Sequence, residues 1–205
     1  MIGIYFGSFN PMHKGHCHVI NTALKTTISK LYCVVSPQSP FKPLSELAPY
    51  DDRLAMANLT KENNGWGDRV EIADWEKHLY PSFTAHTLQK EIPSLNDDKI
   101  TIFMGLDNFL TLDKWREFEY ILENFGIYVV LRGDENAEVQ IHQKIDEFKS
   151  KNIKVKSISY NNPLEKVHLS ATSIRERLSK GEDVGDDICE NVKNYIKEKN
   201  LYIMT

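Results

Sequence analysis

Residues 7–16 combine residue types that together could hold a phosphate group and stabilise charge developing on it. They read GSFNPMHKGH and follow directly on the apolar run 2–6, an order that predicts a strand, a glycine-led turn and a helix. Gly7 lets the backbone approach an anion, and the amides of the turn and of the helix N-terminus point towards that anion. His13 and His16 can donate hydrogen bonds to phosphate oxygens during phosphoryl or nucleotidyl transfer. Either histidine alone would be interpreted as a solvated side chain of an ordinary loop, but the two together favour the phosphate site.

A second candidate for phosphate binding begins at Ser170. This residue is a natural helix N-cap, so free backbone amides and the hydroxyls of Ser170 and Thr172 gather there. Arg175, about one turn further along, supplies a planar and permanently charged cation. A capped surface helix with a solvated arginine explains this segment alone about equally well. In combination with residues 7–16, it would supply the other half of a triphosphate site.

Residues that could hold a ribose and an aromatic base follow another apolar run, at 99–104. Gly105 would let a ribose or a base lie against the backbone, and Asp107 could accept hydrogen bonds from ribose hydroxyls. Trp115 offers a flat face to a heteroaromatic ring. The alternative roles are a helix N-cap for Asp107 and a core position for Trp115.

The first two segments resemble motifs of the nucleotidyltransferase superfamily. GSFNPMHKGH is similar to its (T/S)-x-x-x-H-x-G-H signature, and LSATSIR at 169–175 is similar to its I-S-x-T-x-I-R motif, with Leu169 in place of the first isoleucine. The resemblance implies that His13 and His16 contact the α- and β-phosphates of ATP, and that Arg175 is a third catalytic residue on the β- and γ-phosphates. The residues that it implies for ATP binding are Gly7, Ser8, Phe9, Gly105, Asp107, Ser170 and Thr172.

Two further segments resemble nicotinate- and nicotinamide-mononucleotide adenylyltransferases. Residues 105–115 are similar to the family's G-x-D-N…W segment, in which the tryptophan stacks on the pyridine ring, and PSFTAHTL at 81–88 is similar to its P-S-Y-T-x-x-T-L stretch, with phenylalanine in place of tyrosine. Amides near Thr84 would receive a carboxylate, because helix N-termini favour anions. Lys42, on a proline-rich loop at 36–43, would reach a phosphate when that loop closes. The residues assigned to the mononucleotide are Thr84, Trp115, Lys42 and Arg132, whereas His78 and His86 are expected at the surface without partners.

The resemblance covers nearly the whole chain and implies an adenylyltransferase of NAD biosynthesis, of the bacterial nicotinate-nucleotide type. Such an enzyme moves AMP from ATP, taken with Mg²⁺, to nicotinic acid mononucleotide by direct in-line attack; no dedicated protein metal site is expected. Trp75 and Glu76 resemble a segment of the eukaryotic branch, which also accepts nicotinamide mononucleotide. The first alternative is therefore an enzyme that uses nicotinamide mononucleotide or both mononucleotides. Core packing is the preferred role of Trp75. Phosphopantetheine adenylyltransferase ranks behind that first alternative. A non-catalytic binding module would be expected to lack His13, His16 or Arg175, and all three are present.

The elements that must position these residues follow a regular alternation. Apolar, β-branched runs predict strands at 1–6, 30–36, 69–73, 99–104, 126–131 and 153–157. Amphipathic stretches predict helices at 16–27, 51–61, 84–91, 115–123, 137–151, 171–179 and 187–199. This order indicates an α/β protein, with a Rossmann-like, doubly wound, mostly parallel sheet and C-terminal helices, as a single domain over residues 1–205.

The composition and net charge of the chain limit the classes of partner that it is expected to bind. The 205 residues are 41% hydrophobic and 26% charged, with a formal net charge of −4, so a general nucleic-acid binder is not expected. A phosphate-rich ligand therefore needs a locally basic pocket, for which the candidates are Lys14, Lys42, Arg132 and Arg175. Three cysteines without a C-x-x-C pair, and no predicted signal or membrane segment, indicate a cytoplasmic protein, and homo-oligomerisation is left open.

Overall fold

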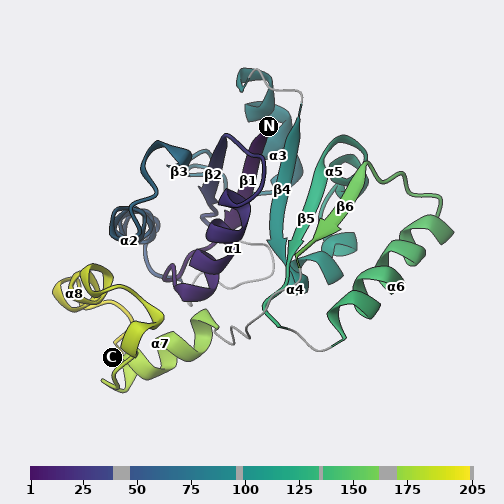
Figure 1. Ribbon diagram of the computed structural model, residues 1–205. Coiled ribbons are helices and arrows are strands. Elements are labelled where there is room, and N and C mark those ends of the chain that lie inside the picture. The colour runs from purple at the N-terminus through teal and green to yellow at the C-terminus, as the bar shows by residue number, and fades with distance from the viewer. Residues whose placement is uncertain (39–46, 96–98, 134–135, 162–169, 204–205) are drawn as a thin grey trace.

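Six parallel strands form one sheet in the order β3-β2-β1-β4-β5-β6 (Figure 1). The computed structural model describes residues 1–38, 47–95, 99–133, 136–161 and 170–203. The strands are β1 (Ile2–Gly7), β2 (Lys30–Val35), β3 (Val70–Ala73), β4 (Ile100–Gly105), β5 (Gly126–Val130) and β6 (Ser157–Tyr160). The prediction of a Rossmann-like α/β fold is confirmed, and every strand pair of the sheet is parallel.

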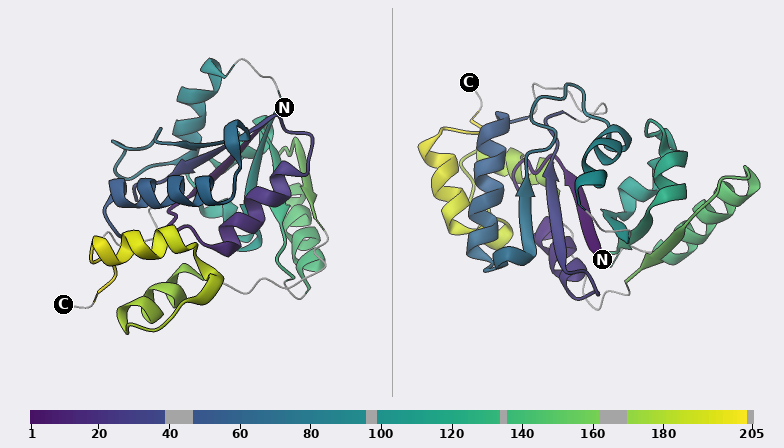
Figure 2. Two further views of the ribbon diagram at one scale, coloured as in Figure 1. Left: turned by 60° about the vertical axis from the view of Figure 1, so that its left-hand side comes forward. Right: turned by 90° about the horizontal axis from the view of Figure 1, so that it is seen from above.

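Helices alternate with the strands and cover both faces of the sheet (Figure 2). They are α1 (Lys14–Leu24), α2 (Tyr50–Asn63), α3 (Thr84–Glu91), α4 (Leu106–Leu110), α5 (Phe118–Asn124), α6 (Ala137–Ser150), α7 (Ala171–Ser179) and α8 (Glu190–Glu198). Alternate strand residues face opposite sides, so Ile4 packs with α3, α4, α5 and α6, whereas Tyr5 packs with α1 and α2. This two-sided burial explains the continuous apolar runs of the strands.

The two C-terminal helices pack on α2 rather than on the sheet (Figures 1 and 2). Met56 of α2 is fully buried in a separate apolar cluster with Ile174 of α7 and Val192 and Ile196 of α8. Through α2, which borders the sheet, this cluster holds the N-terminus of α7 beside the loop that follows β1.

Four predicted elements differ from the observed ones by three residues or more at one end. The helix expected at 16–27 runs from Lys14 to Leu24. The strand expected at 153–157 is wrong, because Ile153 and Val155 lie against the core before the strand and only Ser157–Tyr160 pair with β5. The helix expected at 115–123 begins later, at Phe118, since Glu117 has a left-handed backbone with φ of 55°. The helix expected at 187–199 begins at Glu190.

The strand order changes direction between β1 and β4, and ligands of such sheets bind at the carboxyl ends of the strands at this point. Gly7 and Gly105 are the last residues of β1 and β4. The short helix α4, which the sequence did not indicate, begins directly after Gly105. The topology therefore brings two of the predicted nucleotide-binding segments to one edge of the sheet.

Candidate active site

The loop after β1 has a backbone that only tight packing can maintain. Phe9 has a positive φ of 44°, which is uncommon for a residue with a side chain, and it is 1% exposed. Its ring lies edge-on between Tyr5, at 5.4 Å, and His16, at 5.1 Å between ring centroids. A Cβ atom on Gly7 would lie 2.7 Å from the Phe9 ring, so the ring occupies the space that the glycine leaves.

His13 and His16 cap the first turn of α1 reciprocally. The Nδ1 atom of His13, the N-cap residue, accepts from the amide of Gly15 at 3.0 Å, and Nδ1 of His16 accepts from the amide of His13 at 3.2 Å. The two ring centroids are 3.9 Å apart. Because Nδ1 is the acceptor in both rings, the proton of each neutral imidazole is on Nε2. Both histidines thus carry an Nε2–H donor that the cap does not use.

His13 stays neutral at physiological pH. Burial, and then the positive charge of Arg132, lower the pKa of His13 from 6.5 to about 4, against a smaller opposing effect of Asp187. The side chain is 3% exposed. A neutral imidazole donates a hydrogen bond without adding a buried positive charge beside Arg132.

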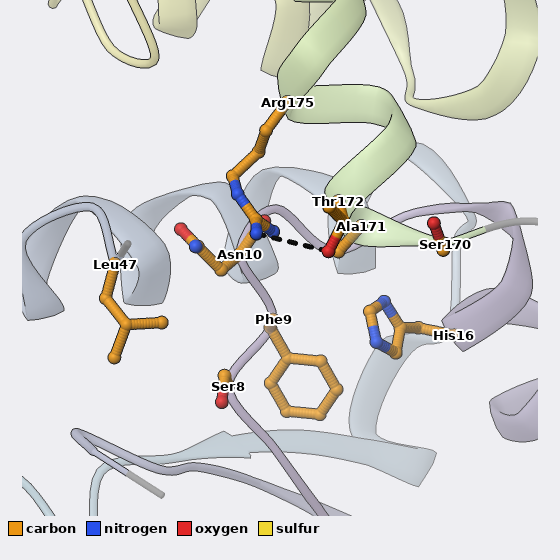
Figure 3. A pocket seen from close by; sticks show the side chains of 9 residues that line it. All are labelled: Ser8, Phe9, Asn10, His16, Leu47, Ser170, Ala171, Thr172 and Arg175. Atoms are coloured by element: carbon orange, nitrogen blue, oxygen red, sulfur yellow. Dashed lines mark hydrogen bonds between the residues drawn. The ribbon is translucent and has the colours of Figure 1, made fainter. Parts of the chain in front are cut away.

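A pocket of about 210 Å³ lies between the loop after β1 and the N-terminus of α7 (Figure 3). Its lining comes from three segments far apart in the sequence. Ser170 and His16 lie on one side and Leu47 on the opposite side. The lining residues are Ser8, Phe9, Asn10, His16, Leu47, Ser170, Ala171, Thr172 and Arg175. Six of the residues predicted for catalysis or ATP binding therefore line one pocket: Ser8, Phe9, His16, Ser170, Thr172 and Arg175.

The N-terminus of α7 supplies the polar side of this pocket. Ser170 is the N-cap, and its hydroxyl accepts from the amide of Ser173 at 3.1 Å. Arg175 reaches back towards the loop, where Nη1 donates to the carbonyl of Asn10 at 3.1 Å and Nη2 donates to the hydroxyl of Thr172 at 3.3 Å (Figure 3). A helix N-terminus with a guanidinium beside it is suited to bind an anion.

Arg132 joins the end of β4 to the histidine turn. One guanidinium nitrogen lies 3.6 Å from Oδ2 of Asp107, and the same nitrogen would lie 3.8 Å from a Cβ on Gly105. The other nitrogen would lie 3.3 Å from a Cβ on Gly15, next to His13. These contacts bring Asp107, Gly105 and Arg132 to the histidine turn, whereas Lys14 is the exposed first residue of α1.

The segments predicted for the mononucleotide also meet. The Arg116 guanidinium lies 5.0 Å from the Phe83 ring centroid, which places the residue after Trp115 against the residue before Thr84. His86 Nε2 lies 2.8 Å from a carboxylate oxygen of Glu117, so the expectation of an unpartnered surface histidine is wrong. The contacts tie the start of α3 to the Trp115 segment.

The remaining assignments have mixed outcomes. Trp115 is half-buried against the core, as is Trp75, whose ring packs on Tyr32 at 4.9 Å. Lys42 and Leu169 lie outside the described residues. Burial raises the pKa of the Cys17 thiol to about 11, as is expected of a packed side chain rather than a nucleophile.

Two residues that shape the pocket were not predicted from the sequence. Asn10 is 3% exposed and lines the pocket, although the motif offered no sign of its importance beyond its place before Pro11. Arg53 is 1% exposed and donates to the carbonyls of Ser8, Ser36 and Pro37 at 2.7 Å each and of Ala48 at 3.0 Å. Its position on the buried stripe of α2, between Tyr50 and Met56, was the available signal.

Two features are absent from the residues that the structure describes. There, no three His, Cys, Asp or Glu side chains gather as a metal ion would require. None of the helices described is both long and apolar enough to cross a membrane.

The chain is also similar to known proteins in sequence and in structure. The model of the cytidylyltransferase-like family matches residues 4–177. Two proteins named "Probable nicotinate-nucleotide adenylyltransferase", from Flavobacterium johnsoniae and Christiangramia forsetii, are each 32% identical to this chain. Each alignment covers 98% of this chain, and it covers 98% of the first relative and 97% of the second. Among solved structures, Plasmodium falciparum nicotinic acid mononucleotide adenylyltransferase complexed with APC superposes with a TM-score of 0.79 at 20% identity, over 98% of this chain and 96% of its own.

These similarities agree with the class of protein that the fold and the pocket define, a nucleotidyltransferase of the cytidylyltransferase-like class. Within that class, the chain belongs to the nicotinate-nucleotide adenylyltransferase family.

Proposed function

We propose that this protein transfers the adenylyl group of ATP to nicotinic acid mononucleotide, with nicotinic acid adenine dinucleotide and pyrophosphate as products. The observation that carries the proposal is the pocket in which His16, Arg175 and the N-cap of α7 face one another. Family membership supports the choice of acceptor, as does the contact between the Thr84 and Trp115 segments.

The reaction needs positioning and charge stabilisation more than proton transfer. A 5′-phosphate oxygen of the mononucleotide attacks the α-phosphorus of ATP, and the bond from that phosphorus to the bridging oxygen breaks as pyrophosphate leaves with the electron pair. The attacking phosphate is already ionised, so no general base is required. ATP enters with Mg²⁺ held by its phosphate oxygens and water, as part of the substrate.

Each residue has a role that follows from its surroundings. The Nε2–H groups of His13 and His16 donate to the α- and β-phosphate oxygens, on which charge develops in the transition state. Arg175 and the amides that follow Ser170 bind the β- and γ-phosphates. Arg132, beside the histidine turn, faces the acceptor phosphate, and Asp107 accepts from a ribose hydroxyl.

The acceptor is tested by measuring pyrophosphate release from MgATP with three candidate acceptors. Nicotinic acid mononucleotide should give the highest kcat/KM. Comparable turnover with nicotinamide mononucleotide would assign dual specificity, and turnover with phosphopantetheine alone would overturn the proposal.

The mechanism is tested by replacing His16 with alanine. His16→Ala should lower kcat by about a hundredfold, because a preorganised donor to the transition state is removed. His78→Ala is the matched control, since His78 is exposed and should leave kcat unchanged. A His16→Ala variant with wild-type kcat would contradict the role of this imidazole.

A further inference from the structure

The segment after α8 contacts the loop that forms the ATP pocket. The Tyr202 hydroxyl donates to Oδ1 of Asn10 at 2.8 Å, although 192 positions separate the two residues. The amide of Ala48 donates to the same oxygen at 3.1 Å. Asn10 therefore connects the chain before α2, the chain after α8 and the loop after β1.

Asn10 also holds a residue of the pocket directly. Its backbone carbonyl accepts from Nη1 of Arg175 at 3.1 Å, and both residues line the pocket. A shift of Asn10 would therefore move the acceptor of Arg175 together with the backbone of Phe9. Because Phe9 has an unfavourable positive φ, this loop depends on its neighbours for its conformation.

Tyr202 is well placed to provide such support. The amide of Leu201 donates to the carbonyl of Ile196 at 3.0 Å, which ends α8 and turns the following residues back towards the loop. Tyr202 has a left-handed backbone with φ of 63°. Burial raises the pKa of Tyr202, so its hydroxyl remains a proton donor over the working range of pH.

We propose that Tyr202 is a positioning residue of the ATP site, whose hydroxyl holds Asn10, and through Asn10 the loop and Arg175, in the arrangement that binds the triphosphate. This inference rests on the proposed function. Tyr202 is absent from the pocket lining, so its effect on ATP passes through Asn10.

The chain offers a closely matched control. The Tyr195 hydroxyl donates to Oδ1 of Asp52 at 2.8 Å and so fastens α8 to α2. It is a phenol hydrogen bond of the same length, from the same end of the chain, to an acceptor outside the pocket lining. Tyr202→Phe and Tyr195→Phe each remove one hydroxyl and leave the ring in place.

The experiment compares these two variants with the wild-type protein by steady-state kinetics and by calorimetric binding of a non-hydrolysable ATP analogue with Mg²⁺. Tyr202→Phe should raise the KM for ATP and the Kd of the analogue about fivefold, the effect of one net hydrogen bond, and leave the KM for nicotinic acid mononucleotide unchanged. Tyr195→Phe should lower Tm about as much as Tyr202→Phe does, but it should leave both the KM for ATP and the Kd of the analogue unchanged.

Two results would overturn the inference: wild-type binding of the analogue by Tyr202→Phe, or equal weakening by both variants, which would indicate general loosening of the C-terminal helices. The calorimetric measurement does not depend on turnover. If the wild-type protein binds the analogue but releases no pyrophosphate with any acceptor, the proposed function fails separately from the role of Tyr202.

Discussion

The neutral state of His13 makes the stability of this protein depend on pH in a calculable way. The folded protein holds the pKa of His13 at about 4, whereas the ordinary value is 6.5. Between these values the unfolded chain binds a proton that the folded protein does not. The stability that is present above pH 6.5 is therefore lost progressively as the pH falls towards 4.

The magnitude follows from the difference between the two pKa values. At about 1.4 kcal/mol for each pH unit, the complete loss is about 3 kcal/mol. At pH 5 the unfolded side chain is almost fully protonated and the folded one is mostly neutral, which gives a loss of about 2 kcal/mol relative to pH 7. Burial is the main cause, Arg132 adds to it, and Asp187 opposes it.

Urea unfolding from pH 7 to pH 4 measures this loss, with His13→Asn as the reference protein. Asparagine retains an oxygen for the N-cap of α1 but does not titrate. Subtracting the two pH profiles removes the contribution of every other titrating group, and the wild-type protein should lose about 2 kcal/mol more than the variant between pH 7 and pH 5.

Parallel pH profiles for the two proteins would refute this reasoning. An NMR titration of the His13 ring provides an independent check, because the ring should remain neutral at pH 5 in the folded protein. A midpoint near 6.5 would mean that neither burial nor Arg132 acts on this imidazole as the structure indicates.

Two further predictions concern Arg53 and Trp115. Arg53→Met should lower the free energy of unfolding by about 3–5 kcal/mol in urea, because it leaves the buried carbonyls that Arg53 binds without their charged donor; a loss below about 1 kcal/mol would contradict the importance of these bonds. Trp115→Ala should raise the KM for nicotinic acid mononucleotide about tenfold and leave the KM for ATP unchanged, the expected cost of one lost aromatic stack. An unchanged KM for the mononucleotide would leave Trp115 with a packing role alone.

The sequence alone was sufficient to predict the elements whose pattern is local. Strands buried on both faces require unbroken apolar runs, so all but the last strand were predicted within a residue or two of the observed boundaries. The strand at 153–157 was misplaced because Ile153 and Val155 are apolar for another reason: they cover the core before β6 begins. A position that packs on the core and a position that pairs in the sheet have the same local pattern, and only the partner strand distinguishes them.

In the candidate site, too, the local patterns could be predicted from the sequence and the long-range contacts could not. The residues of the two phosphate motifs were predicted from their types and spacing, since each motif is a continuous turn and helix start whose amides and side chains act together. Which distant groups meet was decided by tertiary structure. The topology of the sheet buries His13 and sets Arg132 beside it, and both effects lower the pKa of that imidazole. The packing of α8 on α2 directs Tyr202 to Asn10. The local conformation and the functional groups of a motif are determined by consecutive residues, whereas electrostatic and hydrogen-bonding partners that are distant in sequence depend on the path of the whole chain through space.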